Sequence, residues 1–164
     1  MNDESLSLDI SWAEYHRSIE LLAEKISGSK WEFDQIVCIA RGGLRVGDIL
    51  SRIFDRPLAI IAASSYSDDR ERGQLAIGHH LAMTTDKLGS RVLLVDDLVD
   101  SGVTLRQVSE LLRQVHPEVI DLKTAVIWYK SRSIYIPDYY TTHLVNNPWI
   151  HQPFEQYDNW VIKK

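Results

Sequence analysis

The sequence predicts an α/β protein with a central, mostly parallel sheet flanked by helices and a small C-terminal hood. First, continuous apolar runs of strand length recur along the chain, at 35–40, 58–63, 92–95 and 121–128. Runs without polar alternation are typical of strands that are covered on both faces. Second, segments with helical spacing separate these runs, and such alternation of strand and helix signals favours a parallel sheet.

The first helix is predicted over about 12–26, because Ser11 stands three residues before Glu14 with the spacing of a capping box. Gly28 ends it. A second helix is expected at 44–54, and a third follows residue 104 and ends before Pro117. The apolar residues that share one face of the first and third helices are Tyr15, Ile19, Leu22, Ala23, Ile26, Leu105, Val108, Leu111, Leu112 and Val115.

Two segments depart from the alternation of strands and helices. Residues 64–90 open with a polar run and continue with an alternating patch at 74–83 around Gly78, which is compatible with a hairpin. We expect a mobile excursion there. Residues 129–164 are rich in aromatic residues, Pro and Asn, with weak periodicity. We therefore expect one domain over 1–164, with a core over about 10–128 and a hood over about 129–160.

The composition argues against several classes of protein. Hydrophobic residues make up 45% of the 164 residues and charged residues 25%, which is typical of a globular chain. Eighteen basic against 23 acidic residues give a net charge of -5, which argues against general nucleic-acid binding. Without an apolar transmembrane stretch or a signal-like N-terminus, we expect a cytoplasmic protein. Cys38 is the single cysteine and is expected to be a buried structural thiol.

The segment 92–105 carries the strongest chemical signal. A buried strand delivers Asp96 and Asp97 at its end, and a small-residue loop then opens a helix, which is where open α/β sheets place ligands. The backbone N–H groups of 101–104 lack helical partners and suit a phosphate, and Gly102 permits its close approach. The two carboxylates would repel that phosphate, so they are expected to accept hydrogen bonds from hydroxyl groups or to hold a divalent cation.

This segment closely resembles the phosphoribosyl pyrophosphate (PRPP) motif of type I phosphoribosyltransferases, in which four apolar residues precede two acids, two variable positions, a third acid and a phosphate-binding turn. The resemblance implies that Asp96 and Asp97 bind the ribose hydroxyls and that Asp97 also lies near Mg²⁺. It implies that Asp100 is the catalytic acid or base within the PRPP site. The residues it implies for binding the 5-phosphate are Ser101, Gly102, Val103 and Thr104. Val103 stands where the family often has Gly or another small residue, but its backbone donor is retained.

Three other interpretations of the acidic segment fit less well. The acidic motif of prenyl-chain enzymes lies on a helix, whereas here a strand precedes it. Receiver domains place their paired acids near the N-terminus. A solvated acidic turn without a role is seldom found between a fully buried strand and an anion-binding turn.

Two further loops support the resemblance. The first loop follows the first core strand and contains Arg41, Gly42 and Gly43. We expect it at the same edge of the sheet as the phosphate-binding turn. In the family this is the pyrophosphate loop, and we expect its non-proline cis peptide at Ala40–Arg41. Ser65 and Tyr66 resemble the start of the flexible catalytic loop that closes over pyrophosphate. The pair His79–His80 is expected to be structural, because adjacent side chains rarely converge on a metal.

The C-terminal part resembles the bacterial xanthine-guanine phosphoribosyltransferases, with Lys130 after the fourth strand and the run Trp149-Ile150-His151-Gln152-Pro153 beyond it. The resemblance implies that Lys130 donates to the oxygen at purine position six, that Trp149 stacks on the ring and that Ile150 offers its backbone to the opposite edge. The loop 68–90 and the Tyr139-Tyr140 segment depart from the family pattern.

The resulting interpretation is an enzyme of purine salvage, a phosphoribosyltransferase that requires Mg²⁺. It would convert PRPP and a 6-oxopurine (guanine, xanthine or hypoxanthine) to the nucleoside 5′-monophosphate and pyrophosphate. We expect a homo-oligomer, either a dimer or a tetramer. Two alternatives remain open: the same fold with another acceptor base, and a regulator that binds PRPP or nucleotides without transferase activity.

Overall fold

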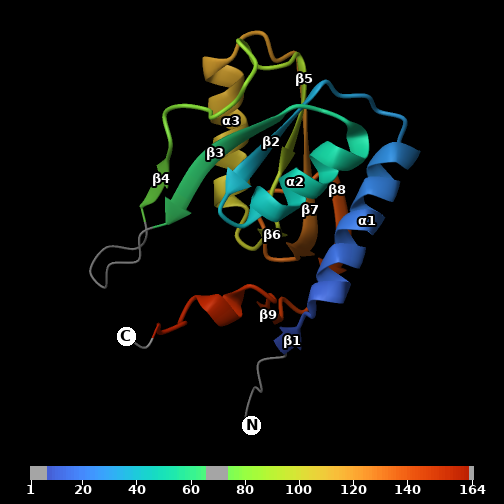
Figure 1. Cartoon of the computed structure of the whole chain (residues 1–164), viewed down its shortest axis with the longest axis vertical. Coiled ribbons are helices and arrows are strands. Elements are labelled where there is room, and N and C mark those ends of the chain that lie inside the picture. The colour runs from blue at the N-terminus through green and yellow to red at the C-terminus, as the bar shows by residue number, and fades with distance from the viewer. Residues whose placement is uncertain (1–6, 66–73, 163–164) are drawn as a thin grey trace.

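The computed structural model describes residues 7–65 and 74–162 and confirms the predicted α/β fold with a mostly parallel sheet (Figure 1). The central sheet has the strand order β4-β3-β2-β5-β7-β6, and β8 also pairs with β7. All of these pairs are parallel except β3 with β4. The strands are β2 (Gln35–Ala40), β3 (Leu58–Ser65), β4 (Leu75–Ile77), β5 (Arg91–Val95), β6 (Leu98–Val99), β7 (Asp121–Lys130) and β8 (Tyr139–Leu144).

Three helices accompany the sheet in the described residues: α1 (Trp12–Gly28), α2 (Gly43–Phe54) and α3 (Val103–Val115). The capping box of α1 is present, with the Glu14 N–H donating to Ser11 Oγ at 3.2 Å and the Ser11 N–H donating to Glu14 Oε2 at 2.8 Å. A short 3-10 turn, η1 (Glu155–Tyr157), lies near the C-terminus. None of the helices in the described ranges is long and apolar enough to cross a membrane.

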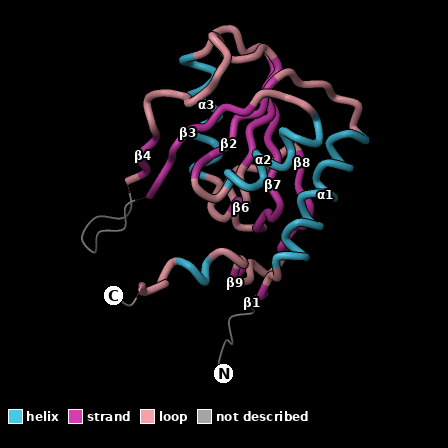
Figure 2. The backbone as a smooth tube through the Cα atoms, in the orientation of Figure 1, coloured by secondary structure: helices cyan, strands magenta, loops and turns pink. Residues whose placement is uncertain are grey.

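Helices cover both faces of the sheet, with α1 and α2 on one side and α3 on the other (Figures 1 and 2). The strand β2 shows the consequence, because Ile36 and Cys38 belong to the core beneath α1 and α2 while Val37 and Ile39 belong to the core beneath α3. This two-sided cover explains why the strand sequences are continuous apolar runs. Cys38 is fully buried, as predicted.

The segment 74–83 does not fold back on itself as the hairpin that its alternation suggested. Instead, β4 pairs antiparallel with β3, and an isolated bridge joins Ala82 to Ile60. The physical reason is that β3 is otherwise an edge strand with unpaired backbone groups, and one of these, the Ala62 carbonyl, accepts the Gly78 N–H at 2.7 Å.

The C-terminal part divides between two sheets. Within the predicted hood range 129–160, β8 extends the central sheet, whereas β9 (Trp149–His151) pairs in parallel with β1 (Ser7–Asp9). The sequence did not predict β1, whose three residues are exposed and carry no periodic signal. Figure 1 shows β1 and β9 together beyond the arrowheads of the central strands.

Candidate active site

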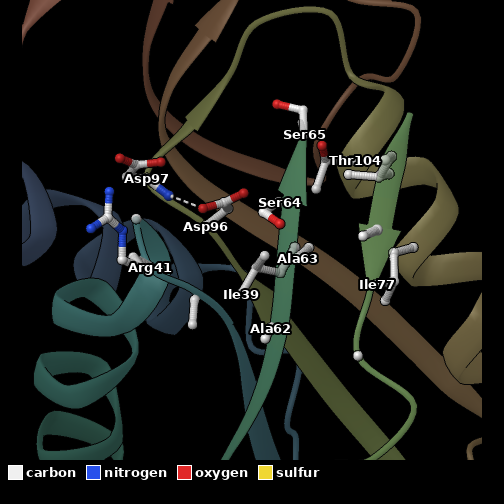
Figure 3. A pocket seen from close by; sticks show the side chains of 15 residues that line it. Ile39, Arg41, Ala62, Ala63, Ser64, Ser65, Ile77, Asp96, Asp97 and Thr104 are labelled. Carbon is white, nitrogen blue, oxygen red and sulfur yellow. Dashed lines mark hydrogen bonds between the residues drawn. The ribbon is translucent and has the colours of Figure 1, made fainter. Parts of the chain in front are cut away.

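The carboxyl ends of the four parallel strands β2, β3, β5 and β7 meet at one edge of the sheet. Several predicted site residues lie at these strand ends or directly after them. Asp96 comes directly after β5, Arg41 follows β2, and Ser65 ends β3. Residues from these positions line a cavity of about 670 Å³ (Figure 3). Its lining includes Arg41, Gly42, Ser64, Ser65, Asp96, Asp97 and Thr104. Tyr66, predicted with Ser65, lies outside the described residues.

The loop after β2 brings its backbone against the acidic pair. The Ala40–Arg41 peptide bond is cis, as expected from the family resemblance. A Cβ atom on Gly42 would lie 2.6 Å from Asp97 Oδ1, which is closer than real Cβ contacts. Only glycine therefore allows this loop to approach the Asp97 carboxylate so closely.

The two adjacent carboxylates differ in their surroundings. Asp96 Oδ1 accepts the Asp97 N–H at 2.9 Å, and burial together with the charge of Asp97 raises the pKa of Asp96 well above its ordinary value. Asp97 is 9% exposed, and its Oδ1 accepts the Leu98 N–H at 2.7 Å. Two carboxylates in the wall of a cavity favour ligands with hydroxyl donors or a hard cation.

The donor set fits Mg²⁺, which binds through one or two carboxylates and completes its shell with water and substrate phosphate oxygens. Asp96 and Asp97 supply the carboxylate oxygens on the cavity wall. Within residues 7–65 and 74–162 no group of three His, Cys, Asp or Glu residues forms a metal cage of its own. A pair of carboxylates on the cavity wall is compatible with this mode of binding.

The turn that opens α3 is held against the loop after β7. Gly102 has φ +82°, and a Cβ atom there would lie 2.8 Å from the Tyr135 backbone nitrogen. The Ser101 carbonyl accepts the Ile134 N–H at 2.9 Å. Thr104 reaches the cavity, and α3 begins at Val103. The first turn of the helix therefore begins at the site edge, where anion sites form, and within it the Val103 N–H donates to Ser101 Oγ at 3.4 Å.

Asp100 lies between two cations. Lys130 Nζ donates to Asp100 Oδ2 at 3.3 Å, and the Arg132 guanidinium forms an ion pair with Asp100 Oδ1. Lys130 is the last residue of β7, not a loop residue after it as the sequence predicted, because β7 runs two residues beyond the predicted end. It is only 2% exposed.

Trp149 joins this group from the small sheet. Lys130 Nζ lies 5.7 Å from the centroid of the Trp149 ring, which is 56% exposed. Asp100, Lys130 and Trp149 are not among the residues that line the 670 Å³ cavity. The Ile150 side chain is buried, and the His151 carbonyl accepts the Ile10 N–H. Because backbone groups alternate along a strand, the N–H and carbonyl of Ile150 point away from β1.

Sequence reasoning missed two polar contacts of the site. Gln152 Nε2 donates to Asp97 Oδ2 at 2.7 Å, and both side chains are buried. Gln152 stood within the run that carried the resemblance, but its contact with Asp97 joins residues 55 positions apart, and no local pattern encodes it. The contact of Arg132 with Asp100 likewise depends on the path of a loop.

A family model described as the phosphoribosyl transferase domain matches residues 11–159. The chain belongs to this family. It is accordingly an enzyme, a phosphoribosyltransferase, and the match extends from the start of α1 through β9 to the C-terminal turn.

Known relatives of this phosphoribosyltransferase agree with the assignment. A xanthine-guanine phosphoribosyltransferase of Idiomarina loihiensis is 29% identical over 153 residues, which cover 93% of this chain and 89% of the relative. A purine phosphoribosyltransferase structure from Pyrococcus horikoshii has a TM-score of 0.76 and 31% identity, covering 96% of this chain and 99% of that one. The xanthine-guanine-hypoxanthine phosphoribosyltransferase of Helicobacter pylori has a TM-score of 0.76 and 25% identity, covering 93% and 95%.

Proposed function

We propose that this enzyme is a cytoplasmic 6-oxopurine phosphoribosyltransferase of purine salvage, which transfers the phosphoribosyl group of PRPP to guanine, xanthine or hypoxanthine. The observation that carries the proposal is the contact of Lys130 with both Asp100 and the Trp149 ring, because Asp100 follows only three residues after Asp97 of the cavity wall. This contact supports a flat site for a base next to a donor site for a sugar phosphate. The names of the relatives support the same acceptor class.

The proposed PRPP site uses both loops and the acidic pair. Asp96 and Asp97 accept hydrogen bonds from the ribose hydroxyls, and the backbone of 101–104 binds the 5-phosphate at the start of α3. Arg41, with the backbone of Gly42 and Gly43, binds the pyrophosphate. Ser65, at the end of β3, lies in the wall of the same cavity.

Asp97 is the proposed Mg²⁺ ligand. When bound, the cation neutralises charge on the pyrophosphate group. The carboxylates themselves hold the sugar hydroxyls in place and offset the positive charge that develops at the anomeric carbon.

The proposed acceptor site holds the purine between a cation and an aromatic surface. Lys130 donates to the oxygen at purine position six, Trp149 stacks on the ring, and the Ile150 backbone binds the opposite edge. A ring nitrogen attacks the anomeric carbon, the bond to pyrophosphate breaks with its electron pair, and Asp100 takes the proton of that nitrogen. Lys130 already contacts Asp100, so one ammonium group links the proposed proton acceptor to the base site.

A panel of bases tests this proposal. The protein is incubated with PRPP and Mg²⁺ and with guanine, xanthine, hypoxanthine or adenine, and nucleotide products are separated by chromatography. We expect product with at least one 6-oxopurine and little with adenine, because an ammonium group can donate to an oxygen but cannot accept from an amino group. Preference for adenine would indicate another acceptor class. PRPP binding without any product would indicate the regulator.

A further inference from the structure

Gln152 joins the small sheet to the acidic pair. It follows β9 directly, two residues after Ile150, and its Nε2 donates to Asp97 Oδ2 at 2.7 Å. The two residues are 55 positions apart in the chain, and their side chains are 8% and 9% exposed. A hydrogen bond from a buried amide to a buried carboxylate is stronger than the same contact in water.

The contact fixes the orientation of both side chains. Asp97 Oδ1 accepts the Leu98 N–H and Oδ2 accepts Gln152, so both oxygens of the carboxylate are held. A carboxylate only accepts, so the amide nitrogen of Gln152 must face it. The amide oxygen of Gln152 is buried and has no partner among the described residues. Asp97 is therefore the contact that sets the amide orientation.

The partners of this bond lie in different proposed subsites. Asp97 belongs to the PRPP site, and β9 carries Trp149 and Ile150, which are proposed to contact the purine. A purine that fixes β9 also fixes Gln152, and through it the carboxylate that receives the ribose hydroxyls. The amide is neutral, so it orients Asp97 without cancelling the charge that the ligand requires.

We propose that Gln152 is a positioning residue that couples occupancy of the purine site to the affinity for PRPP. This inference rests on the proposed function. By linkage, the effect of one ligand on the affinity for the other is reciprocal, so it can be measured as binding without turnover.

The test is calorimetric titration of PRPP with Mg²⁺ in the presence and absence of 9-deazaguanine, a purine analogue whose carbon at position nine cannot form the glycosidic bond. In the wild type we expect the analogue to tighten PRPP binding by about fivefold or more. In Gln152→Met, which preserves side-chain length, we expect the ratio to fall below about twofold. The matched control is Gln156→Met, because Gln156 is exposed and donates only to the Pro153 carbonyl in the described structure.

Gln152→Asn, which shortens the amide by one methylene group, replaces Gln152→Met if the latter fails to fold by circular dichroism. An unchanged ratio in a folded Gln152 variant, or a wild-type ratio of one, overturns the inference. Product formation in the base panel separates this outcome from failure of the proposed function.

Discussion

The carboxylate of Asp100 meets the ammonium group of Lys130 and the guanidinium of Arg132 at the end of the central sheet. Lys130 is almost fully buried, and Asp100 is the carboxylate that its ammonium group contacts. The motif predicted Asp100 from its spacing after the strand. Arg132 escaped prediction because a side chain on a loop has no periodic signal, and only the folded path of 131–133 brings it to the acid.

Asp100→Asn preserves the shape of the side chain but removes its ability to accept a proton. We expect turnover to fall by about 100-fold or more, since general acid–base assistance is typically of that size. PRPP affinity is expected to stay within several-fold of the wild type. Steady-state kinetics and calorimetry measure the two effects. Turnover at the wild-type rate would remove Asp100 from the mechanism.

Trp149→Ala tests the stacking surface. We expect a higher KM for the purine and much less effect on PRPP, because the exposed ring lies over Lys130 in the proposed base site. Trp160→Ala is the control, since Trp160 is also exposed, at 66%, and lies near the C-terminus. Equal losses for both substrates in Trp149→Ala would contradict the stacking role.

At the scale of elements, the turn into α3 depends on Gly102. The positive φ and the close approach of Tyr135 leave no room for a side chain. We expect Gly102→Ala to lower the free energy of unfolding by about 1–3 kcal/mol and to weaken PRPP binding. Gly28→Ala is the matched control, because a Cβ atom at Gly28 meets nothing within 4 Å. Urea unfolding and PRPP titration give the result, and equal stability of the two variants would contradict this account.

The packing of α2 on β2 encloses the single thiol. A Cβ atom on Gly47 would lie 2.6 Å from the Cβ atom of Cys38, and burial raises the pKa of the Cys38 thiol to about 12. At pH 8 the thiol is therefore protonated and shielded. We expect Cys38 of the native protein to react with iodoacetamide only as fast as the structure around it unfolds. In urea we expect the same thiol to react rapidly. Rapid alkylation of the native state, followed by mass spectrometry, would contradict the tight packing.

At the scale of the whole molecule, the sequence predicted the parallel core better than its margins. The strand β2 matches its predicted bounds because an apolar run covered on both faces is an unambiguous signal. The strands β1 and β9 are short, and their pairing joins residues from opposite ends of the chain. Local patterns do not encode such a pairing. For the same reason the bond between Gln152 and Asp97 became visible only in the fold.

The dimer or tetramer expected from the sequence would bury exposed apolar side chains. Those with more than half of their surface exposed include Ile134, Ile136, Val145, Val161 and Ile162. Burial of such surface between copies is favourable. We expect light scattering after gel filtration to give two or four times the mass of one chain. A monomer at micromolar concentration would contradict the proposed assembly.

The most direct test of the central claim is calorimetric titration of the protein with PRPP in the presence of Mg²⁺. The account predicts binding of one PRPP per chain, with loss of that binding in Asp97→Ala. An absence of binding up to millimolar PRPP by a folded wild-type protein would contradict it.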